Sequence, residues 1–416
     1  MKILTATLLL LVLLPLHLFC QSRISGTVTD KQSKQPVDYA SVYINGTTNG
    51  TLTDSLGNFH LDNVRFPCTL VISHLSYKTQ SLNLEYLTSS LNIPMKLKVN
   101  EISGVSVQDR NLREQNMRIF KQQFLGTDTW GKYAIIENEE AIQFSRDYIT
   151  RQSAVVNKKL DYEMRSDPEL QWSADSSMVT YSVPANLKAI SLQPLKIRLP
   201  LLGYTLYYDL VGFMWKYENH YNGDLSAMIG YSFFVPTPFK SKRDSIRILK
   251  NREKCYYNSP QHFCKSLYEN KLAQNGYLLL EHNEQYLTND RTASKFYFSD
   301  EASTISKNSL PDYKKLKQIK RISLYDNIHL QDDHALVTGL KGRRYGICYY
   351  STPKGQPKDL TLFKGSGGTK SAVIFMQDTC LIRNDGTVPD NSIVFGLTLG
   401  SKKVGSMLPE DYQPLK

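Results

Sequence analysis

Beyond its first twenty residues, this 416-residue chain lacks any apolar run near the roughly 20 residues of a membrane-spanning helix. It has six cysteines but no CxxC pair, and none of its eight histidines is followed by glutamate three positions later. The HExxH, GxSxG and GxxxxGK[ST] patterns are missing too. These absences argue against a helical membrane protein, a zinc peptidase, a serine hydrolase of the GxSxG type and a P-loop enzyme.

The first twenty residues predict export. Lys2 precedes the apolar run ILTATLLLLVLLPLHLF, and Cys20 follows it, which is typical of a signal peptide that is removed near Cys20. Lipidation of Cys20 is the alternative, but it requires a small residue before the cysteine, and Phe19 is large. We therefore expect a periplasmic or outer-membrane-associated protein whose mature chain has no transmembrane span.

Lysine and arginine outnumber aspartate and glutamate by eleven. In an exported protein this charge favours an acidic envelope protein, an anionic glycan or lipid headgroups as partner, and nucleic acid is not expected. After Cys20, five cysteines remain, so at least one thiol is free or paired outside the chain. We interpret them as buried small side chains, including the Cys255, His262 and Cys264 group, rather than as metal ligands.

Residues 23–99 predict short strands. The segments RISGTVTD, YASVYING, GNFHL and LNIPMKLKV place apolar side chains at alternate positions, as in a β-sandwich. Between them, Gly46 and Gly50 allow positive φ, and Asp54 and Asn58 can bond their own backbone. We interpret this polar segment as turn chemistry, because a calcium loop needs several acids and Asp54 stands alone.

Residues 24–61 resemble the carboxypeptidase-regulatory-like domain found in exported Bacteroidetes proteins. The matching positions are Ile24, Gly26, Val28, Asp30, Pro36, Ala40, Val42, Gly46, Thr47, Gly50, Thr53, Asp54, Gly57 and Phe59. The resemblance implies a seven-stranded, transthyretin-like β-sandwich of the carbohydrate-binding-like class. Some members of that class bind sugars, and many support folding or docking.

The remaining chain predicts an α+β domain over residues 131–416, after a linker and amphipathic helix over 101–130. Leu112, Met117, Phe120 and Phe124 share one helical face, and Gly126 ends that helix. Residues 133–235 are strand-rich, and the weak alternation of GYTLYYDLVGFMW predicts burial on both faces. From 277 onward we expect short strands, with a hairpin turn at Gly365–Gly368.

Two helices in succession are predicted between residues 241 and 276, as a helical hairpin. The first buries Ile246 and Leu249, and the second is capped by Ser259 with Pro260 in its first turn. The second helix should stop at Gly276. Its expected buried residues are Phe263, Cys264, Leu267, Tyr268 and Leu272.

Several segments of this domain resemble a region that follows the same β-domain in uncharacterised Bacteroidetes envelope proteins. They are FKQQFLG, LKAISLQPLKIRLPLLGYTLYYDL, NREKCYYNSPQHFCKSLYENKL, the Gly276–Tyr277 pair and LPEDYQP. In that region an asparagine usually stands where this chain has Leu199. The resemblance implies a compartment and an architecture but no activity.

Two groups of residues are candidate sites. A surface for an anionic partner, or simply a solvated helix face, is predicted from Lys240, Lys242, Arg243, Arg247, Lys250, Arg252 and Lys254. A second basic run comprises Lys314, Lys315, Lys317, Lys320 and Arg321. A polar pocket at the helix junction is the other candidate, although capping explains most of its members, which are Asn251, Arg252, Tyr256, Ser259 and His262.

We expect neither cofactor nor metal. Asp332, Asp333 and His334 adjoin one another, but neighbours on a strand point to opposite faces, so an exposed turn is the better interpretation. The sequence thus predicts a non-enzymatic binding or scaffold protein of the cell envelope that uses its sandwich for docking. A carbohydrate-binding protein, to which the 26 tyrosines could contribute stacking faces, or an unrecognised glycan or peptide hydrolase is the alternative.

Overall fold

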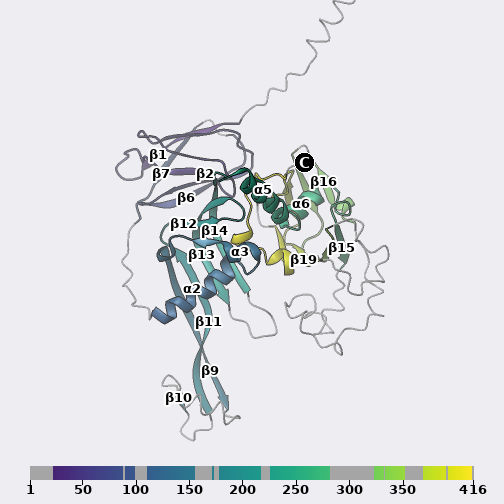
Figure 1. Ribbon diagram of the computed structural model, residues 1–416. Coiled ribbons are helices and arrows are strands. Elements are labelled where there is room, and N and C mark those ends of the chain that lie inside the picture. Colours follow the sequence, from purple (N-terminus) through teal and green to yellow (C-terminus); the bar gives the residue numbers. More distant parts are fainter. Residues whose placement is uncertain are drawn as a thin grey trace, which may run out of the picture. The chain divides into compact units, whose positions relative to one another are not determined.

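A computed structural model of the protein describes residues 22–87, 90–98, 110–154, 171–172, 178–216, 225–281, 323–331, 333–351, 369–389 and 392–414 (Figure 1). Contacts divide the chain into two compact units, one of residues 1–45 and 49–99 and the other of residues 46–48 and 100–416. The predicted signal peptide, the linker at 101–109, the basic run at 314–321 and the turn at Gly365–Gly368 lie outside the described residues.

Seven strands in two sheets form the first unit. One sheet has the order β4-β1-β7 and the other has the order β3-β2-β5-β6. Their bounds are β1 (Ile24–Asp30), β2 (Ser41–Ile44), β3 (Gly50–Leu52), β4 (Asn58–Leu61), β5 (Cys68–His74), β6 (Tyr77–Leu84) and β7 (Leu91–Met95). In β1 and β4 every second residue is buried, which confirms the predicted alternation and the β-sandwich.

Turn chemistry shapes the polar segment between β3 and β4. The Asp54 carboxylate accepts hydrogen bonds from the amides of Leu56 at 2.9 Å and Asn58 at 2.8 Å. Gly57 follows with φ of +74°, a conformation that costs glycine little. The interpretation of Asp54 as a turn residue is therefore confirmed.

A seven-stranded sheet occupies the first half of the second unit. Its main path is β10-β11-β13-β12-β8, with β9 paired to β11 and β14 to β13. The strands are β8 (Ile135–Ile136), β9 (Ile142–Ala154), β10 (Gln171–Trp172), β11 (Met178–Ser191), β12 (Leu195–Leu199), β13 (Tyr204–Lys216) and β14 (Leu225–Pro236). The strand-rich prediction for 133–235 is confirmed.

Helix α2 (Arg110–Phe124) covers one face of this sheet (Figure 1). The fully buried rings of Phe120 and Phe124 stack with centroids 4.7 Å apart, and Phe120 meets Phe213 edge-on at 4.9 Å. The predicted apolar face of the helix is thus confirmed at Met117 and both phenylalanines. Gly126 follows the helix with φ of +96°, and the short helix α3 (Thr129–Tyr133) comes next.

The prediction that the GYTLYYDLVGFMW strand is buried on both faces is wrong. In β13, Tyr204, Leu206, Tyr208 and Leu210 are buried, whereas Val211 is exposed. A β-bulge between Leu210 and Gly212 shifts the register against β14, so burial resumes at Phe213 in the opposite phase. The bulge, and not two-sided burial, weakens the alternation in the sequence.

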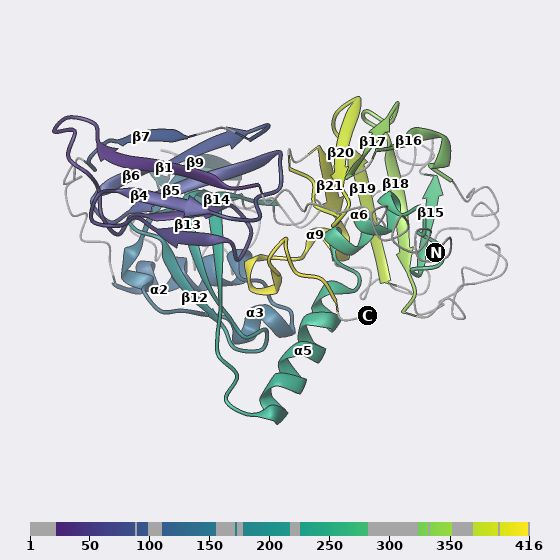
Figure 2. The ribbon, with the colours of Figure 1, turned by 90° about the horizontal axis from the view of Figure 1, so that it is seen from above.

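The second half of the unit contains two smaller sheets, β15-β18-β19-β21 and β16-β17-β20 (Figure 2). Their strands are β15 (Tyr277–Glu281), β16 (Ile328–Leu330), β17 (His334–Thr338), β18 (Arg344–Tyr349), β19 (Thr369–Phe375), β20 (Thr379–Arg383) and β21 (Ile393–Gly396). A separate core lies here, with Phe263, Val373 and Phe375 among its fully buried residues. Short helices α9 (Leu397–Gly400) and η8 (Val404–Ser406) lead to the last described residues.

Helices α5 (Lys242–Tyr256) and α6 (Pro260–Tyr268) lie between the two halves in the sequence. The cap of α6 by Ser259 is confirmed, but the helix ends at Tyr268 and not near Gly276, because Asn270 takes a left-handed φ of +53°. The expected burial of Ile246 is also wrong. That side chain is 59% exposed, while Ile248 is buried, since Ile248 and Arg252 share the inner face of the helix.

All five cysteines in the described part of the chain are buried and form no disulfide with one another, in agreement with their interpretation as small core side chains. None of the helices formed by the described residues combines the length and the apolarity that a membrane crossing requires.

Candidate functional site

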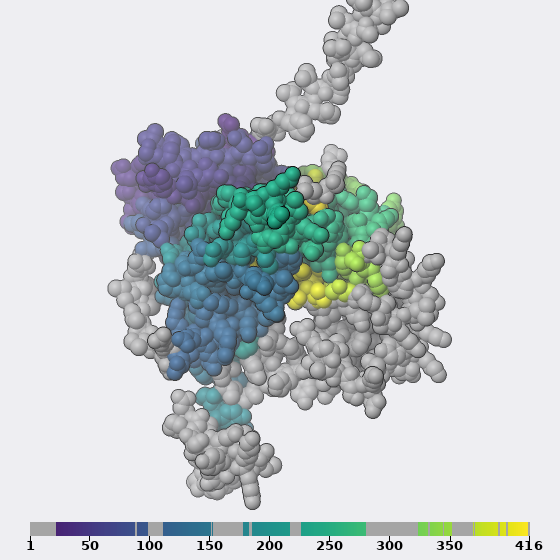
Figure 3. All heavy atoms as spheres, viewed as in Figure 1, coloured from purple at the N-terminus to yellow at the C-terminus, as the bar shows by residue number. Residues whose placement is uncertain are grey.

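The predicted cationic surface is present on α5. Ser241 caps the helix by accepting a hydrogen bond from the Asp244 amide at 3.2 Å. Four exposed side chains, Arg243, Arg247, Lys250 and Lys254, recur at helical spacing and form one stripe. Lys240 and Lys242 are exposed near the start of the helix. Figure 3 shows α5 in dark green at the surface of the molecule.

Asp244 also lies on this surface, and its carboxylate is already paired with a basic side chain of the same helix. Its carboxylate lies 2.6 Å from the Arg247 guanidinium. The side-chain hydrogen bond from Arg247, followed by a bond from the Lys240 amide, holds the pKa of Asp244 below its usual value. Arg243, Lys250 and Lys254 therefore remain to define a positive strip on the solvent side of the helix.

Arg252, the seventh basic residue of the predicted surface, points inward. Its Nε donates to the Leu202 carbonyl at 2.7 Å and its Nη2 donates to the Gly203 carbonyl at 3.0 Å. The guanidinium carbon lies 3.9 Å from the centre of the Tyr204 ring. Burial lowers the pKa of Arg252. This arginine therefore holds the turn between β12 and β13 and is not part of the outer surface.

Asn251 acts on the same turn. Its side-chain amide donates to the Leu201 carbonyl at 3.0 Å. Gly203 takes a φ of +65°, and a Cβ at that position would lie 2.9 Å from Ile248. The turn is thus pressed closely against α5, and two adjacent side chains of the helix satisfy three of its carbonyl groups.

The other predicted pocket residues lie at the junction of α5 and α6. His262 is buried, and its ring centre lies 5.2 Å from that of Tyr256. The Nδ1 atom of His262 is 2.8 Å from the Tyr277 hydroxyl and accepts from the Asn258 amide at 3.3 Å. Because that amide can only donate, the neutral ring carries its proton on Nε2. Ser259 accepts from the His262 amide at 3.1 Å.

Electrostatics keep this junction neutral. Burial, and to a lesser extent the charge of Lys265, lowers the pKa of His262 to about 4. Burial also raises the pKa values of Tyr256 and Tyr277 well above their ordinary range. The Tyr256 hydroxyl is buried without a hydrogen-bond partner in the described part of the protein. At neutral pH the junction therefore presents uncharged aromatic groups to one another.

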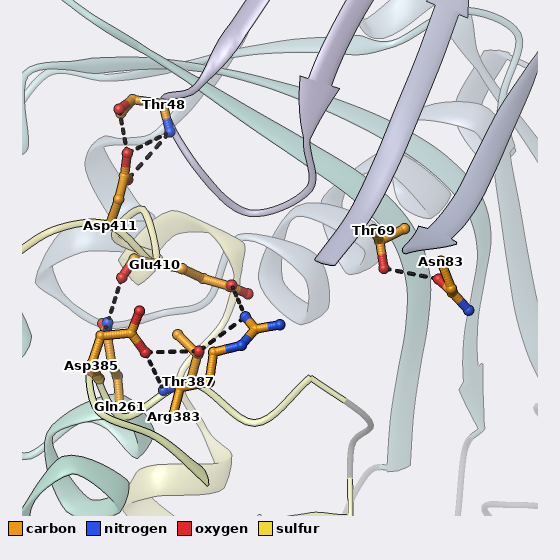
Figure 4. Close-up of polar contacts among 9 residues, drawn as sticks. All are labelled: Thr48, Thr69, Asn83, Gln261, Arg383, Asp385, Thr387, Glu410 and Asp411. Atoms are coloured by element: carbon orange, nitrogen blue, oxygen red, sulfur yellow. Dashed lines mark hydrogen bonds and ion pairs between the residues drawn. The ribbon is translucent and has the colours of Figure 1, made fainter. Parts of the chain in front are cut away.

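The structure adds a polar cluster that the sequence did not predict (Figure 4). It joins α6, the end of β20 and the C-terminal segment. Gln261 donates to the Glu410 carbonyl at 2.9 Å and to the Asp385 carbonyl at 3.3 Å. Arg383 lies 3.8 Å from the Glu410 carboxylate, and Thr387 donates its hydroxyl to Asp385 at 2.8 Å.

Within this cluster, Glu410 is a carboxyl whose pKa is strongly raised. Burial above all raises the pKa of its carboxyl; Arg383 opposes this, Asp385 and Asp411 add to it, and the resulting pKa is about 7. Of the Glu410 side-chain surface, 42% remains open to water, and solvent therefore screens its interactions with these charged groups. The sequence signal that could have located the cluster was the LPEDY motif, with two adjacent acids near the C-terminus.

A groove of about 730 Å³ lies between α2 and the 3₁₀ turn Glu139–Ala141. Lys121 and Glu139 form an ion pair of 2.5 Å at its wall. The groove is lined by Arg113, Glu114, Met117, Arg118, Lys121, Gln122, Glu139 and Glu140. Its walls thus mix both charges, which gives it no preference for a ligand of one sign.

Within the described ranges, no group of three or more His, Cys, Asp or Glu side chains could hold a metal ion. The Cys255 thiol donates to the Ser406 carbonyl at 3.2 Å. His334 and Asp333 lie 2.6 Å apart at the start of β17, and Asp332 lies outside the described residues. Cys255, His262, Asp333 and His334 are therefore engaged in hydrogen bonds with protein groups.

Residues 24–107 match the family model of the CarboxypepD_reg-like domain. No curated protein matches the chain. Structural comparison gives an N-terminal interface mutant of a type II cohesin–X-dockerin complex from Acetivibrio cellulolyticus, 22% identical, with a TM-score of 0.16. This match covers 18% of the present chain and 56% of that chain.

Two further structures come from Bacteroides. A protein from Bacteroides fragilis, provisionally described as membrane-associated and of unknown function, is 12% identical over 52% of this chain and 98% of that chain, with a TM-score of 0.16. A protein from Bacteroides uniformis, provisionally described as carbohydrate binding, is 10% identical over 51% and 96%, with a TM-score of 0.15. At such scores none of these structures defines the fold or function of the present chain.

Proposed function

We propose that this protein, whose residues 24–107 match the CarboxypepD_reg-like domain family, is a non-enzymatic binding or scaffold protein of the cell envelope. In this proposal the sandwich is the docking module, and the second unit is an α+β domain carrying the α5–α6 hairpin. The protein is exported after cleavage near Cys20 and is periplasmic or attached to the outer membrane. Its partner is an envelope protein or an anionic glycan or lipid headgroup.

One observation carries this proposal. Two of the residues that the sequence predicts for a pocket, Asn251 and Arg252, use their side-chain hydrogen bonds on the backbone of the chain itself, donating three bonds to carbonyl groups. Gln261, from the cluster that the sequence did not predict, donates two more. Donors used in this way stabilise the scaffold, so recognition falls to exposed surfaces such as the positive strip of α5.

The test is crosslinking in cells. The tagged full chain would be crosslinked, purified under denaturing conditions, and the retained proteins identified by mass spectrometry. A defined envelope protein recovered in near-equal amount would support the scaffold role. Charge reversal of the strip, with Arg243→Glu and Lys250→Glu, should lower that recovery if α5 takes part, whereas the matched pair Lys271→Glu and Lys341→Glu should not.

Recovery of no protein partner would refute the scaffold role as framed. Under that outcome a glycan ligand becomes the next hypothesis, and binding of purified protein to acidic glycans would be measured.

Hydrolysis of a glycan or peptide is the second candidate function, and Glu410 favours it. A carboxyl with a raised pKa can act as a general acid near neutral pH, particularly beside a second carboxylate such as Asp385. If this function is correct, the purified protein should release product from envelope glycan or peptide, and Glu410→Gln should abolish the release. Equal turnover by Glu410→Gln would rule out this role.

A further inference from the structure

Several turns of the first unit meet at one end of the sandwich. Ser41 pairs with Leu52 and with Ser73, so the turns before β2, after β3 and after β5 lie at the same end. β1 runs parallel to β7 with Asp30 beside Met95, which brings the segments after both strands to that end as well. We call this set the turn end; it comprises residues 31–40, 53–57, 74–78 and 96–98.

Backbone hydrogen bonds join these segments directly. The Tyr39 amide donates to the Thr53 carbonyl at 3.1 Å. The Lys98 amide, after β7, donates to the Ser76 carbonyl, between β5 and β6, at 2.8 Å and so links the two sheets, and the Lys31 amide donates to the Met95 carbonyl at 2.8 Å. The turn end is therefore a single surface held together by main-chain contacts.

Large apolar side chains protrude from this surface. Tyr39 is 74% exposed, Leu56 and Leu75 are each 68% exposed, and Leu97 is 48% exposed. Each of the first three lies in a turn, where a polar or small residue would serve the fold equally well. Four apolar side chains gathered at one end of a small sandwich indicate a binding surface.

Tyr39 adds a second, independent observation. Its φ is +53°, in the left-handed region that large side chains rarely adopt. Burial of the ring does not compensate this strain, because the ring is largely in water. Strained residues that persist without a packing reason occur preferentially at functional sites. The conformation presents the ring outward, away from the core.

Positive charge surrounds the apolar side chains. Lys31, Lys34, Lys78 and Lys96 are all exposed at the turn end. Three acids lie among them: Asp38 is exposed beside Tyr39, whereas Asp30 accepts from the amides of Gln32 and Ser33 at 2.8 and 2.7 Å. Asp54 is held in the same way by the amides described above. A ligand that meets this surface would contact an apolar centre with a cationic rim.

We propose that the turn end docks on an anionic lipid surface, with Tyr39, Leu56 and Leu75 entering the headgroup and acyl boundary. Leucine and lysine are under-represented where protein surfaces bind each other tightly, whereas an apolar centre with a lysine rim suits a charged bilayer. A second copy of the chain is disfavoured, because each carries a net charge of +11. This inference rests on the proposed docking role of the sandwich and names its target.

The test is flotation of the purified full chain with vesicles. Vesicles of phosphatidylcholine alone are compared with vesicles containing about one third phosphatidylglycerol. Because the apolar first twenty residues can enter either membrane, the proposal is tested by the difference in vesicle binding between the variants and the parent protein. We expect Leu56→Asp with Leu75→Asp to weaken binding to anionic vesicles at least about tenfold. The matched control is Leu330→Asp, on a strand of the second unit and 60% exposed, and it should bind as the parent protein does.

A second measurement reports insertion directly. Tryptophan placed by Leu75→Trp should be quenched by brominated lipid in anionic vesicles, whereas tryptophan placed by Leu330→Trp should not. Equal quenching at both positions, equal weakening by the control, or loss of binding only with the α5 charge reversals would each overturn the proposal.

The two proposals fail separately. Capture of an envelope protein by a chain that ignores anionic vesicles refutes the lipid docking and leaves the scaffold role standing. Insertion of the turn end without any protein partner supports the lipid docking and refutes the scaffold role.

Discussion

Acidification should remove the stability that the neutral His262 ring contributes. The ring is buried against Tyr256 and Tyr277, and burial lowers its pKa to about 4, while an exposed histidine titrates near 6.5. Each unit of separation between the folded and unfolded pKa corresponds to about 1.4 kcal/mol. The free energy of unfolding of the second unit should therefore fall by about 3 kcal/mol on this account.

The direction follows from proton uptake. Above about pH 6.5 both states leave His262 neutral, so the full stability is present. Between about pH 6.5 and about pH 4 only the unfolded chain takes up the proton, so stability declines as the pH falls. Below that window both states are protonated, and this group causes no further loss.

The assay compares the parent protein with His262→Gln by urea unfolding. The three tryptophans, Trp130, Trp172 and Trp215, all belong to the second unit, so their fluorescence follows that unit. Near pH 7 the variant should be less stable by about 1–3 kcal/mol, because it loses the contact with Tyr277 and the ring packing. This difference should shrink toward about pH 4 as the parent protein loses its advantage.

Glu410 is present in both proteins, so its effect cancels from the difference. Its raised pKa acts in the opposite direction, since stability from this carboxyl declines as the pH rises from about 4.5 to about 7. A difference between parent and variant that stays constant over this range would refute the reasoning. An NMR titration that places the His262 pKa near 6.5 would do the same.

Three further predictions follow from the contacts. Arg252→Met should lower the free energy of unfolding, measured in urea, by about 2–4 kcal/mol, because two buried carbonyls lose their donor. Lys250→Met, on the exposed face of the same helix, should change it by less than about 0.5 kcal/mol. Equal losses in the two variants would contradict the inward role of the arginine. Gly230→Ala should lower the free energy of unfolding by about 1–3 kcal/mol, since a Cβ there would lie 2.4 Å from a tyrosine ring. Gly212→Ala has open space around the new Cβ and should leave the stability unchanged. Identical melting temperatures of the two variants would contradict this prediction. Tyr39→Asn should slow amide hydrogen exchange in the first unit, because asparagine adopts left-handed φ more readily, and should weaken vesicle binding; faster exchange would show that the ring stabilises the fold.

Local patterns were sufficient where one residue determines its own neighbourhood. The Asp54 turn, the Ser259 cap and the apolar face of α2 each depend on contacts within a few residues, and the structure has all three. The β-sandwich likewise follows from alternation that is uninterrupted in β1 and β4.

Patterns failed where the structure depends on a partner distant in the sequence. Val211 is the extra residue of the β13 bulge, between Leu210 and Gly212, but only the register against β14 reveals it, and the sequence without the bulge predicts burial on both faces. The sequence places Arg252 in two candidate sites, the cationic surface and the polar pocket at the helix junction, because its helix is rich in lysine and arginine and leads into that junction. Its real contacts lie some fifty residues away, in the turn at Leu202 and Gly203. The sequence fails to predict the Glu410 cluster for the same reason, because Gln261 and Glu410 are far apart in the chain.

Arg252 and Tyr39 show two opposite uses of side chains that sequence alone would misplace. The arginine is a charged group held inside, where two carbonyls and an aromatic ring replace its hydration, so its value to the protein is structural. The tyrosine is a large apolar ring held outside, on a backbone that resists the required φ. Folding alone would favour the reverse at position 39, because removing the ring costs no burial and relieves strain. A residue kept against the stability of the fold points to binding, and in our proposal the recognition surface of the sandwich is therefore its turn end.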